Sequence, residues 1–560
     1  MTSGADISSA LSSRKALTYA PPTLRILFVI DGRIRLDHSE LEFGLGYVLD
    51  TLCDPSWNAA RIELGIATRE TSISDDARDG REVRYRGLKF TQLDFNIDAW
   101  DQIWFFADQP NTDDGGPRDT DANILPPYVL DDDEARILAE WMDRGGGVFA
   151  TGDHGVLGAS LCHRIPRVRT MRRWKIADGV PPLDGSNHNQ TWQGENPSYS
   201  SEGDLLLQPI ELLNTQVVHS IPFLFLTRPH ALLCSDLGPI DHFPDHMHEG
   251  ELVPDDEVDL DRPLGIPDYT RPEYPVAVPE ILASAIRDIG VALPRPRPHI
   301  IAYGKTTHAR YLDLSPELSG NAIALAFPLQ LPPKRFGLVS VYDGDLVGLG
   351  RVVCDSTWHH WLSINLHGIA QANNTDYQKM RAYYRNIALW LATPEQRRAM
   401  SLAAVWGVLT LSGPMAFSGR YSPWDLGERA LTLLARWFAP CWINELVASQ
   451  VNATSLYLAK RTGESDSSTP AWGGLPEELV NRAVLGAMCQ ALKPLAADVR
   501  RAQTLRSDVE VDPEEIEKLA ARGVAEVPKI IRENLDRAIR TLSGLRDTVA
   551  TAERRASSTY

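Results

Sequence analysis

Four segments of the sequence place an aspartate directly after an apolar run that suits a β-strand. The aspartates are Asp31, Asp108, Asp153 and Asp355, and His154 follows Asp153. Ligands of open parallel sheets bind beyond the carboxyl ends of the strands, where converging carboxylates repel one another unless a proton or a cation compensates. We expect Asp153, His154 and Asp355 to be catalytic. Asp31 and Asp108 are expected to bind substrate, and capping of a following helix is the alternative for each aspartate.

A second group of chemically active residues lies in the run DHFPDHMHE, residues 241–249. Alternate residues of an extended segment point to the same side, so His246 and His248 could reach one metal ion. Asp245 and Glu249 would complete a ligand set that suits zinc, manganese or iron better than calcium. The spacing matches no established metal motif, and a polar loop whose histidines cap backbone groups is the alternative.

Two adjacent histidines follow Asp355 in the run WHHW, residues 358–361. Histidine titrates near neutral pH and is therefore a natural general acid or base. Adjacent residues diverge on a helix or a strand, so we expect at most one of the two histidines to face a site. We favour His359.

A run of arginines follows the segment around His154 in an otherwise acidic chain: Arg164, Arg167, Arg169, Arg172 and Arg173. Guanidinium groups bind carboxylates and phosphates through two hydrogen bonds. We therefore expect Arg164, Arg167 and Arg169 to bind an anionic small molecule. Neutralisation of nearby acidic residues is the alternative.

The elements that must position these residues are those of an α/β protein. Apolar runs at 24–30, 61–67, 102–107 and 147–151 predict strands covered on both faces, as in a parallel sheet. Residues 131–143 predict an amphipathic helix with an acidic cap, ended by the glycines that follow. Strand, helix and strand in this order predict a doubly wound, mostly parallel, flavodoxin-like sheet.

Beyond this region the pattern changes twice. Residues 181–298 are rich in proline, aspartate and polar side chains, and they predict a long insertion. Strands are expected again at 299–303, 321–329 and 337–342, the last followed by a hairpin turn and a strand within 346–354. A helix at 377–391 would close the domain. We therefore expect a flexible N-terminus at 1–22, an α/β domain at 23–395 and a helical region at 396–560.

Two of these segments resemble a known superfamily. DDDEARILAEWMDRGGGVFATGDHG (131–155) and GRVVCDSTWHHW (350–361) are similar to the acid-capped helix, glycine run and C-terminal His-Trp element of ThuA-like, class I glutamine amidotransferase-like proteins. The resemblance covers about residues 24–391, without the insertion, and implies the same fold. Gly152, Asp153, His154 and Gly155 stand where a glutaminase needs its elbow cysteine, and Cys162 lies well past that turn. Glutamine hydrolysis is therefore excluded.

A weaker resemblance concerns caspase-like peptidases. The turns 152–155 and 353–357 are similar to the His-Gly and cysteine-bearing turns of that class. Thr357 stands where the nucleophilic cysteine would be expected, so the resemblance does not extend to the nucleophile.

Composition limits the partners. The 560-residue chain carries a formal net charge of −18, which opposes nonspecific binding to nucleic acid or anionic lipid. Its six cysteines are scattered and include no CxxC pair, which predicts a reducing compartment. Residues 1–22 lack the apolar core of a signal peptide, and the apolar stretch 399–417 is broken by glycine and proline. A cytoplasmic protein with a buried helix at 399–417 and no membrane partner is expected.

The region after residue 393 contains no histidine and is rich in helix-forming residues. Asp512-Pro513-Glu514-Glu515 predicts a helix start. Apolar residues then recur every three or four positions from Val527 to Val549, which predicts one apolar seam. The seam needs a partner, either a helix at 479–499 or a second copy of the chain. We favour a homo-oligomer.

Two functions remain open from the sequence. The first is a metal-assisted hydrolase that acts on an anionic small molecule and uses a divalent ion, Zn, Mn or Fe, to activate water. The second is a non-catalytic amidotransferase-like module for binding or assembly. The fold alone does not separate the two.

Overall fold

A computed structural model describes residues 21–32, 34–57, 59–71, 73–109, 128–152, 157–174, 207–213, 216–221, 224–244, 252–276, 295–305, 309–311, 329–331, 335–411, 421–435, 438–450, 477–504 and 513–557. The chain forms two compact units. One unit contains the described residues of 23–216 and 228–396, and the other those from 397 onward together with 21–22 and 217–227.

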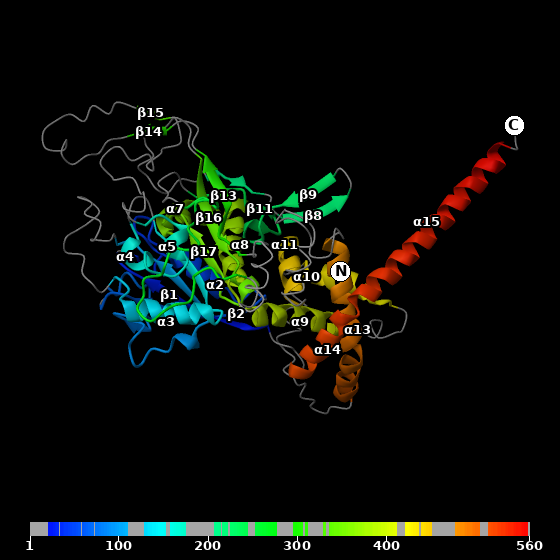
Figure 1. Ribbon diagram of the computed structural model, residues 1–560, viewed down its shortest axis with the longest axis horizontal. Coiled ribbons are helices and arrows are strands. Elements are labelled where there is room, and N and C mark those ends of the chain that lie inside the picture. Colours follow the sequence, from blue (N-terminus) through cyan, green and yellow to red (C-terminus); the bar gives the residue numbers. More distant parts are fainter. Residues whose placement is uncertain are drawn as a thin grey trace, which may run out of the picture. The chain divides into compact units, whose positions relative to one another are not determined.

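A large sheet forms the centre of the first unit (Figure 1). It has nine strands, in the order β3-β2-β1-β4-β5-β17-β16-β13-β7. All pairs from β3 to β17 are parallel, and the remaining pairs are antiparallel. The strands are β1 (Thr23–Ile30), β2 (Arg61–Thr68), β3 (Tyr85–Arg86), β4 (Gln102–Phe106), β5 (Gly147–Thr151), β7 (Glu211–Leu212), β13 (His299–Lys305), β16 (Arg335–Tyr342) and β17 (Val352–Asp355). The expectation of a mixed α/β protein with a large, mostly parallel sheet is confirmed.

Helices pack on both faces of this sheet. On one face Phe149 lies against Trp361, which in turn contacts Tyr383 of α8 (Thr375–Trp390). The same unit contains α2 (Gly46–Cys53) and α7 (Ser363–Ala372). On the other face a core formed by alternate strand residues includes side chains of α3 (Asp132–Asp143), α4 (Ala159–Cys162) and α5 (Val168–Met171). Burial on both faces explains the continuous apolar runs of the strands.

Helix α3 begins with the predicted acidic cap. The Asp131 side chain accepts a hydrogen bond from the Glu134 N–H, and the Glu134 side chain accepts one from the Asp131 N–H. Gly145, at φ +104°, follows the helix. The helix therefore starts and stops where the local sequence predicts.

Short elements occupy the inserted segment and the connections. They are η1 (Ile97–Ala99), β6 (Gln208–Pro209), β8 (Gln216–Ile221), β9 (Leu224–Arg228), η4 (Ala231–Leu233), β10 (Cys234–Ser235), β11 (Gly238–Pro239), β12 (His242–Phe243), β14 (Ala309–Tyr311), β15 (Leu329–Leu331), η5 (Gly344–Val347) and η6 (Trp358–His360). The strand predicted at 321–329 lies mostly outside the described residues. Between β16 and β17 the chain forms η5, so the hairpin connection is longer than a tight turn.

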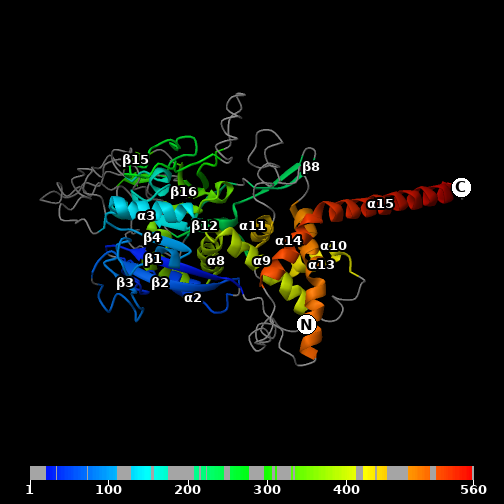
Figure 2. The same cartoon turned by 60° about the horizontal axis from the view of Figure 1, so that its bottom comes forward.

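The second unit is helical apart from most of the β8–β9 hairpin (Figure 2). Its helices are α9 (Pro394–Leu411), α10 (Pro423–Leu434), α11 (Pro440–Gln450), α13 (Glu477–Thr504), α14 (Pro513–Ala525) and α15 (Val527–Ser557). Met400, Val405 and Leu409 of α9 are buried, as expected for that apolar stretch. Among the described helices, none has the length and apolar character needed to cross a membrane.

Candidate functional site

Four loops leave the parallel strands at one edge of the sheet. Ile30, Phe106, Thr151 and Asp355 are register partners across β1, β4, β5 and β17. The chain runs outward from β1 to β2 and then returns to β4 on the other side of β1. This reversal makes the gap beyond β1 and β4 a topological switch point, which is the usual ligand position in open α/β sheets.

The predicted aspartates share this edge but lie on two faces of the sheet. Asp355 lies on the face of α8, where its Oδ2 accepts a 2.9 Å hydrogen bond from the Tyr383 hydroxyl. Asp31 follows Ile30 by one residue and therefore points to the opposite face. Its charge contributes there to the raised pKa of Cys162, after the larger effect of burial. The side chains of Asp31 and Asp355 therefore do not form one carboxylate cluster.

Neither of these two aspartates caps the helix that follows it. Helix α2 begins after Leu45 and has no side-chain cap, and η6 is capped by the Thr357 hydroxyl. The capping alternative is therefore wrong for Asp31 and Asp355.

Asp355 and His360 form a buried pair. His360 Nδ1 lies 2.8 Å from Asp355 Oδ1, and both side chains are almost fully buried. The indole N–H of Trp361 donates to Asp355 Oδ2 at 3.0 Å, beside the Tyr383 bond. Within the described part of the chain His360 Nε2 has no hydrogen-bond partner. An aspartate on Nδ1 fixes the imidazole so that Nε2 is the nitrogen left for acid or base chemistry.

Two aromatic side chains contact His360, one at its ring and one at its backbone. The Phe243 ring of β12 lies over the imidazole, with ring centroids 4.4 Å apart. The Tyr384 hydroxyl donates to the His360 carbonyl at 2.8 Å. Residues from the inserted segment and from α8 therefore meet at His360.

His359 points elsewhere. Its Nδ1 lies 3.0 Å from Asn365 Oδ1, and its backbone N–H donates to the Thr357 hydroxyl at 3.1 Å. The expected divergence of the two histidines is observed. The histidine placed beside Asp355, however, is His360, and not His359 as favoured from the sequence.

Asp31 and Asp108 meet at the switch point. The Asp108 backbone N–H donates to Asp31 Oδ1 at 2.5 Å, and Gln109 Nε2 donates to Asp108 Oδ2 at 3.1 Å. Burial, together with the charges of Asp108 and Glu70, raises the pKa of Asp31 well above its ordinary value. Within the described residues Asp31 Oδ2 has no hydrogen-bond partner. A protonated Asp31 could donate a hydrogen bond from this edge.

Gly32 makes the close approach of these two loops possible. It has φ +59°, and a Cβ atom at this position would lie 2.2 Å from Gln109 Nε2 and 2.7 Å from Asp108 Oδ2. Only glycine adopts this conformation readily while leaving that space.

The arginine run is occupied by partners within the same unit. Arg169 donates twice to Glu273 Oε2, at 3.0 and 2.5 Å. Arg167 donates to the Glu273 carbonyl at 3.0 Å and pairs with Asp143 at 2.8 Å. Arg164 pairs with Asp132 and donates to the Leu130 carbonyl. These contacts fit the alternative in which the arginines neutralise acidic residues, and they fasten residues 252–276 to the sheet unit.

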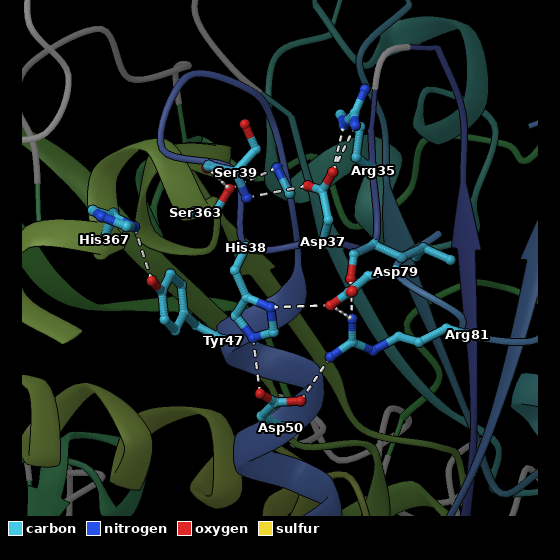
Figure 3. A network of polar contacts seen from close by, with 12 residues as sticks. Arg35, Asp37, His38, Ser39, Tyr47, Asp50, Asp79, Arg81, Ser363 and His367 are labelled. Atoms are coloured by element: carbon cyan, nitrogen blue, oxygen red, sulfur yellow. Dashed lines mark hydrogen bonds and ion pairs between the residues drawn. The ribbon is translucent and has the colours of Figure 1, made fainter. Parts of the chain in front are cut away.

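A polar network supports the loop after β1 (Figure 3). His38 Nε2 lies 2.8 Å from Asp50 Oδ2, and His38 Nδ1 lies 3.3 Å from Asp79 Oδ2. Arg81 pairs with the same two carboxylates at 2.6 and 3.2 Å. The sequence carries no signal for this network, because its members come from segments without a common spacing.

The same loop is bound to the segment after β17. The Ser363 hydroxyl, at the start of α7, donates to the Ser39 carbonyl at 2.5 Å and accepts from the Gly44 N–H at 3.1 Å. The Tyr47 hydroxyl lies 3.0 Å from His367 Nδ1. The loops that begin at Asp31 and Asp355 are thus held together.

The remaining predicted residues lie outside the described part of the chain. They are Asp153, His154, Asp245, His246, His248 and Glu249. In the part that is described, no three His, Cys, Asp or Glu side chains come together as a metal site. Tyr383 and Trp361 were not predicted as site residues, because a tyrosine inside a helix and an indole carry no spacing signal.

Comparisons with models of protein families, with curated proteins and with solved structures find no match to this chain.

Proposed function

We propose that this protein is a hydrolase in which His360, oriented by Asp355, acts as the general base. The observation that carries the proposal is the buried pair: Asp355 Oδ1 lies 2.8 Å from His360 Nδ1, and Nε2 has no hydrogen-bond partner among the described residues. A carboxylate on Nδ1 holds the required tautomer and stabilises the imidazolium that forms when Nε2 takes a proton. The Tyr383 and Trp361 bonds to Oδ2 keep the carboxylate in place.

A divalent ion is a second part of the proposal. Asp245, His246, His248 and Glu249 would hold it, and it would lower the pKa of a bound water. The support is the alternation of these residues in the sequence, together with the contact of Phe243, two residues before Asp245, with His360. Metal analysis of the purified protein tests this part separately. Bound Zn, Mn or Fe should be lost when His246 and His248 are both changed to alanine.

The substrate class is left to experiment. Glu273 and Asp143 already engage Arg167 and Arg169, so the arginine run adds no support to an anionic substrate. Hydrolysis of p-nitrophenyl acetate and p-nitrophenyl phosphate, each with and without Mn²⁺, compares a neutral with an anionic substrate. A preference for the phosphate would support the anionic class.

The role of His360 is tested with a matched pair of variants. His360→Gln should lower hydrolysis of the better substrate by about a hundredfold or more, since a positioned general base contributes at least that much. His359→Gln, one residue away and equally buried, should leave more activity. Free imidazole should partly restore His360→Gly, which a purely structural role would not allow. Equal loss in both glutamine variants, with no rescue, would argue against the assignment.

A non-catalytic module is the second candidate, and the burial of Asp355 and His360 favours it. Both side chains are nearly inaccessible, and both oxygens of Asp355 are engaged. In this case the pair joins β17 to η6, and His360→Gln lowers the stability of the protein without affecting any hydrolysis. Reaction of wild type with diethyl pyrocarbonate, mapped by mass spectrometry, separates the two functions, because a catalytic Nε2 must be reachable.

We also propose that the sheet is doubly wound and flavodoxin-like, as the resemblance to ThuA-like proteins implies. The reversal of strand order beside β1 and the helices on both faces support this assignment. An experimental structure of the residues outside the described ranges would test it.

A further inference from the structure

Most of the apolar stripe of helix α15 is uncovered by the described residues. Its first turns pack in the helical unit, where Val527, Ile530 and Ile531 are buried. Both views show the rest of α15 extending beyond α13 and α14 (Figures 1 and 2). The large apolar side chains beyond this point are 40 to 65% exposed: Leu535, Ile539, Leu542, Leu545 and Val549. A lone helix with this stripe is marginal in water, so the stripe calls for a partner.

The stripe has the repeat of a two-stranded coiled coil. Leu535, Leu542 and Val549 are seven residues apart, and Ala538 and Leu545 lie three residues after the first two. These are the a and d positions of a heptad. We infer that α15 pairs with α15 of a second copy of this chain as an antiparallel coiled coil. This inference is independent of the proposed function.

Side-chain volumes favour the antiparallel orientation. In a parallel pair every layer joins a residue to itself, so Ala538 would face Ala538 and leave a gap. In an antiparallel pair centred between residues 543 and 544, Ala538 faces Val549 and Leu542 faces Leu545. Alternation of small and large residues fills a core to native density, whereas a void loses contacts.

The charges beside the stripe select the same arrangement. In the antiparallel register, position 532 of each copy, an arginine, lies opposite position 553 of the other copy, a glutamate. The two-fold symmetry gives two such pairs. A shift by one heptad towards the N-terminus would instead oppose Arg532 to Arg546, which repel. The parallel pair sets Thr541 beside Arg546 and forms no ion pair. Flanking charges of this kind set the partner and the orientation of coiled coils.

The antiparallel register also covers Ile539, which lies beside the main stripe. It faces Arg546 of the other copy, whose methylene groups can pack over the isoleucine while the guanidinium stays in water. The second copy therefore accounts for all five exposed apolar residues of α15.

Oligomeric mass tests the pairing. Analytical ultracentrifugation of the full chain should give twice the 62.1 kDa of one copy. Leu542→Glu/Leu545→Glu should raise the dimer Kd by more than about tenfold. Ser543→Glu/Thr551→Glu, on the outer side of the same helix, is the control and should stay dimeric. Circular dichroism of the variants checks that the helical unit is folded. A monomeric wild type, or a dimer that survives the double leucine change, would refute the inference.

Charge exchange tests the orientation. Arg532→Glu should weaken the dimer, and adding Glu553→Arg should restore it, because the two positions face each other only in the antiparallel register. Cysteines give a second readout. Ala538→Cys/Val549→Cys should form a disulfide between copies under oxidation, and Ala538→Cys alone should not. Efficient self-linking of Ala538→Cys would show a parallel pair and overturn the proposed orientation.

Discussion

At the scale of single residues, two buried aspartates of the sheet unit have different surroundings. Asp31 is 2% exposed and faces the charges of Asp108 and Glu70, and its pKa is raised mainly by burial. Asp355 is equally buried but receives bonds from His360, Trp361 and Tyr383. The two carboxyl groups therefore differ in their surroundings: burial and neighbouring charges raise the pKa of Asp31, whereas three side chains donate to or lie within hydrogen-bond distance of Asp355.

Asp31 should make stability depend on pH. Because its pKa is higher in the folded than in the unfolded chain, the folded state binds more protons between these two values. The free energy of unfolding therefore falls as the pH rises from about 4, the ordinary pKa of an aspartate, through the pKa of Asp31 in the folded chain. Asp31→Asn should remove this loss, so the stability of wild type relative to the variant should fall from pH 5 to pH 8 in urea unfolding. Asp98→Asn, at a 62% exposed side chain, is the control. A difference between wild type and Asp31→Asn that does not change with pH would contradict the prediction.

At the scale of elements, helices α10 and α13 of the second unit approach each other closely at two glycines. Gly427 of α10 lies so close to α13 that a Cβ atom would be 1.9 Å from the Arg482 carbonyl oxygen. Gly486 of α13 has the same relation to the Pro423 carbonyl, at 2.0 Å. The backbone contact is therefore specified by the absence of side chains at these two positions.

Alanine at two helical glycines should have opposite effects. Gly427→Ala would force α10 away from α13, and overpacking of this kind costs about 1–3 kcal/mol. Gly544→Ala lies in α15 with no atom within 4 Å, so it should gain up to about 1 kcal/mol of helix propensity. Thermal unfolding measures the stability of both variants when it is followed by circular dichroism at 222 nm, a wavelength at which helices give a strong signal. Unchanged stability of Gly427→Ala would mean that the α10–α13 contact is looser than described, and a loss in Gly544→Ala would contradict the open surroundings of that residue.

At the scale of the whole molecule, each unit has its own core. Glu273 anchors the sheet unit through Arg167 and Arg169, and Gly427 lies in the helical unit. Chains of several domains commonly unfold in more than one step.

Calorimetry should resolve two transitions, and each variant should shift one of them. Glu273→Gln leaves the buried guanidinium group of Arg169 without its carboxylate, which costs about 3–5 kcal/mol, and should lower the transition of the sheet unit by several degrees. Gly427→Ala should lower only the other transition. Glu257→Gln breaks the exposed pair with Arg173 and should have little effect. A single transition moved by both Glu273→Gln and Gly427→Ala would show that the units unfold together.

The sequence by itself determined the elements whose signals are local. The strands at 24–30, 61–67 and 147–151 follow from apolar runs that need no distant partner to be recognised, and α3 follows from its capping residues and glycine stop. The start of α14 at Pro513 and the apolar repeat of α15 are equally local, because helix caps and heptads are read within a few residues.

Only the tertiary structure decided which side chains meet. Asp31 and Asp355 look alike in the sequence, yet a one-residue difference in strand register sends them to opposite faces of the sheet. His359 and His360 are adjacent, and the choice between them depends on the position of Tyr383 on α8 and Phe243 on β12. The arginine run shows no partner nearby in the chain, and Glu273 lies more than a hundred residues away. Contacts of this kind arise from long-range packing, which no local pattern encodes.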